Sequence, residues 1–244
     1  DLGTNSSLSL FEHHLGVNNS HFSNISTFIS LMDGSNFNHT RIQLDSNESI
    51  NIGNIHTSQS RDSKYKFSNF SIGSDLGFIN IHTSLNGKGS ECHLSGLSLS
   101  KDKQHMDTHI LTKHNATDCI STQNFKTILK DYSSGVFNGK VVVQKNAQKT
   151  DSEQSNKNLL LSENAKINSN PQLVIHADNV KCAHGSSTGE IDPDALFYMQ
   201  SRGLDQKTAK SLLINGFASE IFEQIIDKTI QKYIFEQFNK WINE

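Results

Sequence analysis

Residues 146–189 read NAQKTDSEQSNKNLLLSENAKINSNPQLVIHADNVKCAHGSSTG, and this stretch decides the fold. Short runs of alternating side chains are separated there by Asn, Ser, Gly and Asp, which are the residues that favour turns. The stretch ends in the pair Cys182-x-His184. Because successive side chains of a strand point to opposite faces, these two should share one face. The stretch therefore predicts short strands that place a thiol and an imidazole side by side.

The same alternation extends upstream to about residue 7. It is clearest in residues 7–11, 50–52, 78–81 and 92–97, and turn-forming residues at 33–35, 74–75, 86–89 and 138–139 predict ends of strands. No helical pattern intervenes, so a sandwich, a barrel and a β-solenoid all remain open. Abundant Asn and Ser favour the solenoid, because stacked turns place like residues above one another.

Beyond Gly189 the pattern becomes helical. Asp192 is a candidate N-cap with Pro193 at the first helical position, and Gly203 is expected to end this helix. Asp205 is the candidate cap of a second helix.

We expect Gly216 to end the second helix and a third to span residues 217–241. Apolar side chains recur in this third segment at steps of three and four, at Phe222, Ile226, Ile230, Tyr233, Ile234, Phe238 and Trp241. The stripe has two interpretations. It covers the open end of the β region, or it docks another protein.

The bulk composition excludes several functions. A net charge of -3 with 19% charged residues provides no basic field for nucleic acid. The longest apolar runs fall well short of the roughly 20 residues that cross a bilayer. Three widely spaced cysteines, Cys92, Cys119 and Cys182, indicate reduced thiols in the cytoplasm or a plastid stroma. Because the sequence starts at Asp1, we expect further residues upstream.

Cys182 and His184 are the best candidates for chemistry. Both are metal ligands in proteins, but a closed zinc site usually takes four ligands, so the others would come from a partner or from distant turns. The structural alternative is a buried cysteine and a hydrogen-bonded turn histidine. His176 and Asp178 precede them with matching parity, yet Asp178 lies in a predicted corner, so we do not expect His176 to be a ligand.

A second group, His105, Asp107 and His109, alternates along one predicted strand face. We interpret it as a hydrogen-bonded ladder. Cys92 and Cys119 are expected to pack in the core, with His93 on the opposite face from Cys92. The phosphate-binding loop is absent and no paired carboxylates stand out, so we predict no enzymatic activity.

Five segments in order carry a resemblance to a known family: GVFNGK (135–140), AQKTD (147–151), NLLLS (158–162), VKCAHG (180–185) and LFYMQSRG (196–203). They resemble the SufD branch of the SufB/SufD family, which assembles iron-sulfur clusters in the SUF system. The resemblance implies a right-handed parallel β-solenoid over residues 1–189 and a small helical domain over residues 190–244. The N-terminal helical domain usual in the family is absent from this chain.

The resemblance also implies a role. The chain would be a scaffold subunit that pairs with SufB near Cys182 and His184, helps iron to enter, and docks the ATPase SufC. Iron or a cluster would be held transiently at the SufB interface, with no permanently bound cofactor, and the isolated chain could form a homodimer. We assign the SufC contact to Phe222, Ile226, Ile230 and Tyr233, and the metal contact to His184 first and Cys182 second.

Two positions separate this chain from SufB. Asn156 stands where SufB carries an essential cysteine, and Gly185 stands where SufB has a glutamate beside the histidine. The rival interpretations are a carbohydrate-active solenoid such as a polysaccharide lyase, and a secreted adhesin-like solenoid. The first needs an acidic or calcium-binding groove, for which the sequence offers no cluster.

Overall fold

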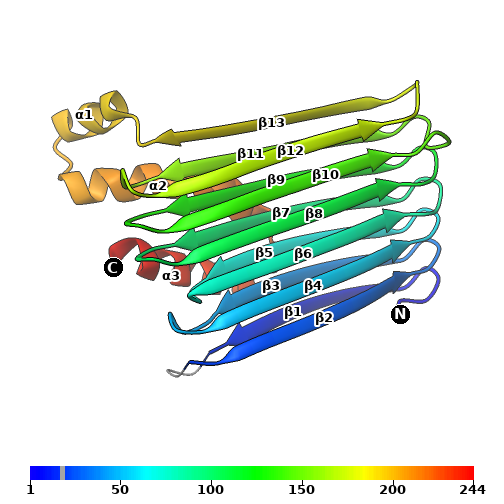
Figure 1. Ribbon diagram of the computed structural model, residues 1–244, viewed down its shortest axis with the longest axis horizontal. Coiled ribbons are helices and arrows are strands. Elements are labelled where there is room, and N and C mark those ends of the chain that lie inside the picture. The colour runs from blue at the N-terminus through cyan, green and yellow to red at the C-terminus, as the bar shows by residue number, and fades with distance from the viewer. Residues whose placement is uncertain (17–19) are drawn as a thin grey trace.

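The computed structural model describes residues 1–16 and 20–244, and shows thirteen strands followed by three helices in these ranges (Figure 1). The strands are β1 (Ser7–Leu15), β2 (Phe22–Leu31), β3 (Asn36–Leu44), β4 (Ile50–Gln59), β5 (Lys64–Ile72), β6 (Leu76–Leu85), β7 (Glu91–Ser100), β8 (His105–His114), β9 (Ile120–Leu129), β10 (Ser134–Val143), β11 (Asp151–Leu160), β12 (Lys166–Ile175) and β13 (Lys181–Glu190). The helices are α1 (Pro193–Ser201), α2 (Gln206–Glu223) and α3 (Lys228–Asn243).

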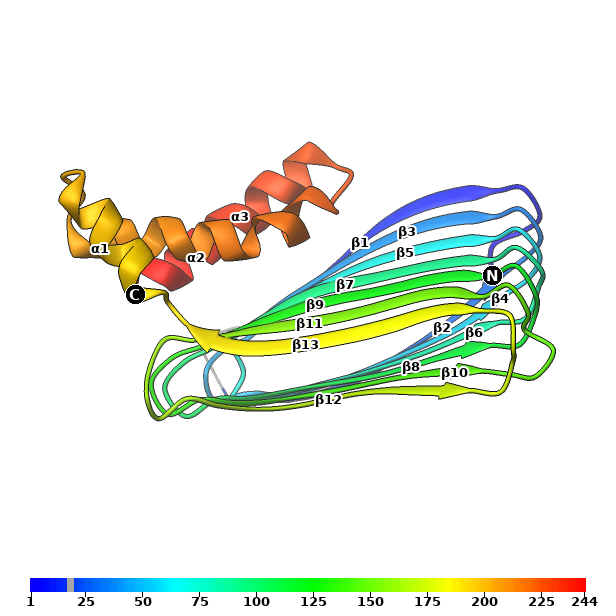
Figure 2. The same cartoon turned by 90° about the horizontal axis from the view of Figure 1, so that it is seen from above.

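The strands form two parallel sheets that face each other. Odd-numbered strands make the seven-stranded sheet in the order β1-β3-β5-β7-β9-β11-β13, and even-numbered strands make the six-stranded sheet. The chain thus alternates between the sheets and coils as a parallel β-solenoid of about 6 turns (Figure 2). The expected fold class is confirmed.

Side chains along the strands alternate between the interior of the solenoid and its outer surface. Phe37, Tyr65 and Cys92 occupy matching positions on successive turns, and all three are buried. Cys119 is also buried, and His93 points to the other side from Cys92, so the packing role predicted for these two cysteines is confirmed.

Hydroxyl groups stack at the corner that precedes the seven-stranded sheet. Ser35, Ser63, Ser90 and Thr150 each donate a hydrogen bond from the side chain to the carbonyl oxygen three residues earlier. All four residues are buried. These repeated corner bonds are one physical reason for the high serine content.

The expected turn at residues 138–139 is wrong. Asn138 and Gly139 lie inside β10, where Gly139 faces the interior. A β-carbon on Gly139 would collide with Gln154 and Phe137. The glycine therefore makes room for neighbouring side chains and does not mark the end of a strand.

The caps of the first two helices are confirmed. The side chain of Asp192 accepts a hydrogen bond from the Asp194 backbone N–H at 2.9 Å, and Pro193 begins α1. Gly203 follows α1 with φ at +94°, a left-handed conformation that glycine adopts without strain. The side chain of Asp205 accepts from the Thr208 backbone N–H at 3.0 Å.

The expected break at Gly216 is wrong. α2 continues through Gly216 to Glu223, so Phe222 belongs to α2 and not to the third helix. Residues 224–227 form the non-helical link between α2 and α3. Asp227 caps α3 by accepting hydrogen bonds from the Thr229 and Ile230 backbone N–H groups. A single glycine costs a helix only about 1 kcal/mol, and packing of α2 on the sheet outweighs this cost.

The apolar stripe covers a sheet face. Ile234, Phe238 and Trp241 of α3 are buried in one hydrophobic cluster with Phe70 and Leu97 of the seven-stranded sheet. The helices lie over the outer face of this sheet (Figure 2), where α3 also contacts β1 through Tyr233, and they leave the terminal strand β13 exposed. The expectation that the stripe covers the open end of the β region is therefore wrong. Within the described ranges, no helix is long and apolar enough to span a membrane.

Candidate functional site

The last turn of the solenoid has two open edges. β13 ends the seven-stranded sheet and β12 ends the six-stranded sheet. Every residue of β13 except Cys182, which is half-buried, is exposed. Unpaired backbone groups on such an edge are a template for pairing with another strand.

Cys182 and His184 both lie in β13, as predicted, and share one face. They pair in register with Ser152 and Gln154 of β11, which are buried in the interior of the solenoid. Because register neighbours point the same way in a parallel sheet, the thiol and the imidazole face inward at the open end. The thiol is the deeper of the two.

The Cys182 side chain packs against a small apolar cluster that contains Val141, Val143 and Ala177. Burial raises the pKa of this thiol, as does the nearby charge of Asp151, although a backbone hydrogen bond from Ser152 lowers it in part. The protonated thiol is therefore the favoured form at neutral pH. A metal would need the thiolate, so ligation by Cys182 requires a change in its surroundings.

Asn156 occupies the interior of the same end and is fully buried. Its Nδ2 donates to the Phe125 carbonyl at 3.2 Å, and its Oδ1 accepts from Asn158 Nδ2 at 2.7 Å and from Ser169 Oγ at 2.8 Å. The amide is fixed by these bonds and offers no nucleophile. This chain thus has a structural amide at Asn156.

The other sequence candidates have structural positions. Asp107 and His109 form an ion pair at 2.9 Å on β8, and His105 Nδ1 lies 2.7 Å from Ser134 Oγ on the next strand. The predicted ladder therefore forms only in part, because His105 bonds to the neighbouring strand and not to Asp107. In the part of the chain that the structure describes, no three His, Cys, Asp or Glu side chains converge in a way that could hold a metal ion.

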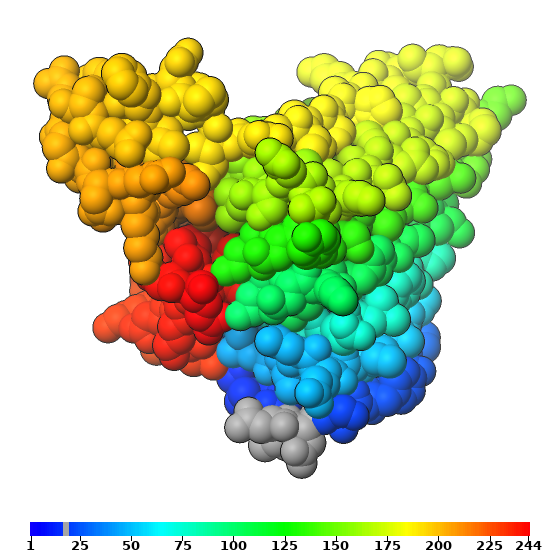
Figure 3. Space-filling view, turned by 60° about the vertical axis from the view of Figure 1, so that its left-hand side comes forward, coloured from blue at the N-terminus to red at the C-terminus, as the bar shows by residue number. Residues whose placement is uncertain are grey.

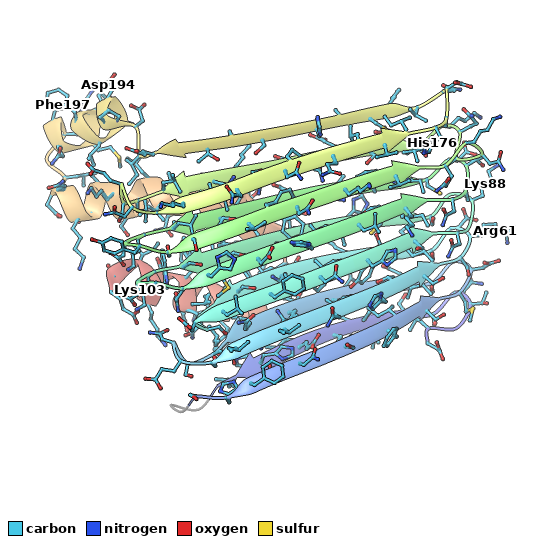
Figure 4. The ribbon with its side chains drawn as sticks, viewed as in Figure 1. Arg61, Lys88, Lys103, His176, Asp194 and Phe197 are labelled. Carbon is cyan, nitrogen blue, oxygen red and sulfur yellow. The ribbon has the colours of Figure 1, made fainter. Side chains whose placement is uncertain are left out.

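His176 lies just beyond β12, in the connection whose bend includes Asp178. The predicted corner is therefore confirmed. Figure 4 shows His176 at the end of the strands opposite to α1.

The four residues assigned to SufC docking do not form one exposed surface. Phe222 is only 5% exposed, whereas Ile226, in the link between α2 and α3, is 60% exposed. Ile230 and Tyr233 are half-buried, and the Tyr233 hydroxyl lies 3.2 Å from His13 Nε2 on β1. The docking role of these residues stays a prediction, and Ile226 is the most accessible of them.

α1 exposes an aromatic pair that the sequence assignment of docking residues omitted. Phe197 is 72% exposed and Tyr198 58% exposed, and no residue of α1 is buried. The helix projects from the body of the protein beside the end of β13 (Figure 3), and Figure 4 shows Phe197 on its outer part. The available signal was the apolar run LFYM in a helix too short to bury both of its sides.

Comparison with known proteins fits this geometry. Residues 1–217 match the model of the SufBD core domain of SUF system FeS cluster assembly. The chain is 36% identical over 84% of its length to an iron-sulfur cluster assembly SufBD family protein of Synechocystis, and covers 45% of that protein. It is 30% identical over 98% of its length to the iron-sulfur cluster assembly protein SufD of Escherichia coli, and covers 57% of it.

The chain is also 34% identical over 79% of its length to the chloroplastic protein ABCI7 of Arabidopsis thaliana, of which it covers 41%. The chain thus spans about half the length of the curated relatives that it matches. The family match assigns it to iron-sulfur cluster assembly and not to the carbohydrate-active or adhesin-like solenoids. On its sequence match and its parallel β-solenoid with C-terminal helices, the chain belongs to the SufBD family of the SUF iron-sulfur cluster assembly system.

Proposed function

We propose that this chain is a non-enzymatic scaffold subunit of a SUF complex, which pairs with a SufB paralogue through its open last turn. The observation that carries the proposal is the location of Cys182 and His184 on an uncovered edge strand. A sister solenoid presents strands at the same spacing of about 4.8 Å, so its edge fits that of β12 and β13. Pairing would bring partner residues against the inward-facing thiol and imidazole.

The partner has to supply the sulfur-accepting group. Asn156 is locked in hydrogen bonds within the last turn, and the two other cysteines, Cys92 and Cys119, are fully buried in the core. Burial raises the pKa of the Cys92 thiol to about 12, which suppresses its thiolate. A paralogue with a reactive cysteine complements this subunit.

The exposed His184 imidazole is the group of this chain that would meet incoming iron, which is the substrate of assembly. It forms no hydrogen bond within the described ranges and is solvent-exposed, so its nitrogen is free to bind. Cys182 would join it only if movement of the partner exposed the thiol and lowered its pKa. ATP hydrolysis by SufC is the proposed source of this movement.

The experiment replaces His184 by Ala in the reconstituted complex of this chain with SufB and SufC. Iron content and cluster yield should both fall, while assembly of the complex is retained. His176→Ala is the matched control, because His176 is exposed on the same end turn but lies outside β13. A cluster yield equal to that of the control in the His184→Ala complex would remove His184 from the mechanism.

The helical layer is the proposed SufC-binding surface. Phe197 and Tyr198 of α1 and Ile226 of the link between α2 and α3 offer exposed apolar side chains there. Aromatic side chains near the centre of a protein interface usually contribute most of its binding energy. We place the complex in the cytoplasm or a plastid stroma, and we expect the isolated chain to form homodimers through the same open end.

A further inference from the structure

Two imidazoles lie side by side on the outer face of the six-stranded sheet. His56 of β4 and His82 of β6 are register neighbours, with ring centroids 5.8 Å apart and an interplanar angle of 60°. On the next strand Phe28 stacks on His56 at 5.0 Å and 11°. This face is turned away from the helices (Figure 2) and is remote from their contacts.

Neither imidazole has a hydrogen-bond partner within residues 1–16 and 20–244. His82 Nε2 is shielded from solvent and unpaired. Other histidines of the solenoid are paired, for example His93 with Thr122 at 3.0 Å and His105 with Ser134 at 2.7 Å. An unpaired buried nitrogen is uncommon in proteins and calls for a specific explanation.

The surroundings of His82 disfavour its protonated form. Burial lowers the pKa of His82, and the nearby charges of Lys113 and His56 lower it further. His82 is therefore neutral at physiological pH and keeps a lone pair on one ring nitrogen. A neutral imidazole is the form that binds transition metals.

We propose that His56 and His82 form a two-histidine site for a borderline divalent transition-metal ion, with water completing the coordination. Adjacent strands are about 4.8 Å apart, so two side chains on the same face can each bring one ring nitrogen to about 2.1 Å from a shared ion. Imidazole pairs suit Cu²⁺, Ni²⁺ and Zn²⁺, with Cu²⁺ the tightest. The inference is independent of the proposed scaffold function.

The surroundings supply a second layer of polar groups. A recess of about 410 Å³ at the pair is lined by Ser30, Ser58, Ser84 and Asn86, whose polar side chains suit hydrogen bonds to coordinated water. Asn86 Nδ2 already donates to Ser58 Oγ at 3.0 Å. Asp1 is the acidic residue among those that line the same recess. Lys113 acts in the opposite direction, because its ammonium group repels a bound cation.

The experiment titrates the whole chain with Cu²⁺ held by iminodiacetate and follows binding by electron paramagnetic resonance. The chelator fills part of the coordination sphere, so a neighbouring pair of imidazoles binds the complex far better than a lone one. His56→Gln and His82→Gln should each weaken binding at least tenfold. His105→Gln is the control and should leave this binding event unchanged, because His105 belongs to a separate, hydrogen-bonded group.

A further variant tests the site without altering a ligand. Lys113→Gln removes the repelling charge and should tighten binding a few-fold, with the two-nitrogen signal retained. Thermal melting of each variant checks that the solenoid is intact. Equal affinity in the wild type and in both ligand variants would overturn the proposal, as would an affinity for Lys113→Gln equal to or weaker than that of the wild type.

Discussion

Phe70 of β5 stacks in a parallel, offset arrangement on Phe222 of α2, with ring centroids 5.7 Å apart and planes 11° from parallel. Phe222 also contacts Phe238 of α3 at 5.0 Å, so one ring joins the sheet to both helices. We expect Phe222→Ala to lower the free energy of unfolding by about 3–5 kcal/mol, the usual loss for a buried phenylalanine. Urea unfolding followed by circular dichroism measures it. Ile226→Ala, at an exposed position, should change stability by less than about 0.5 kcal/mol.

Capture of SufC should depend on the exposed helical residues. Phe197→Ser and Ile226→Asp are each expected to reduce capture in a pull-down at least tenfold, because both remove exposed apolar contact area and neither disturbs the core. Phe28→Ser is the matched control, since Phe28 is 76% exposed on the opposite sheet. Full capture by both helical variants, with melting temperatures like that of the wild type, would show that the ATPase binds elsewhere.

Stability should fall in mild acid because of His114. Burial lowers the pKa of this imidazole from 6.5 to about 4, so the unfolded chain takes up a proton at pH values where the folded protein does not. Its contribution to stability is complete above about pH 6.5 and is lost as the pH falls towards 4. The loss between pH 7.5 and pH 5 is about 2 kcal/mol. His114→Gln should remove this part of the pH dependence, which urea unfolding at pH 7.5 and pH 5 measures. An equal loss of unfolding free energy between these pH values in the wild type and the variant would contradict the prediction.

Gly139 should tolerate no side chain. A methyl group there would press against Phe137 and Gln154 in the interior of the solenoid. We expect Gly139→Ala to lower the free energy of unfolding by about 1–3 kcal/mol through overpacking. Asn138→Ala, on the adjacent outward-facing position, is the control. If Gly139→Ala and the wild type unfold at the same midpoint urea concentration, the neighbouring side chains move aside at no cost in free energy.

The sequence predicted the strands better than their ends. Alternation indicated the strands, because burial of one face imposes a period of two. The repeat length stayed hidden because pairing partners lie between 26 residues apart, as for Ile50 and Leu76, and 32 apart, as for Ser134 and Lys166. Loops of unequal length absorb this variation. The sequence wrongly predicted a turn at Asn138-Gly139 because turn propensity is a local property. It does not report that Gln154 of the opposite sheet packs against Gly139.

The candidate site was predicted in part. Parity within β13 correctly placed Cys182 and His184 on one face, since this is a local property of a strand. Whether that face points inward depends on the opposite sheet, which the local pattern does not report. The helical stripe failed for a related reason: Phe222 and Ile226 follow one period, yet the break at residues 224–227 turns one into the core and the other towards solvent.

The position of the helical layer also determines how the solenoid opens. Its hydrophobic cluster joins the helices to strands from β1 to β11, whereas β13 has a neighbour on one side only and no helix covering it. In a stack where each turn contacts only adjacent turns, fraying starts at the unsupported end. Amide protons of β13 should therefore exchange with deuterium earliest and those of β5 and β7 latest, which makes the open edge at β13 the most pliable part of an otherwise stiff column.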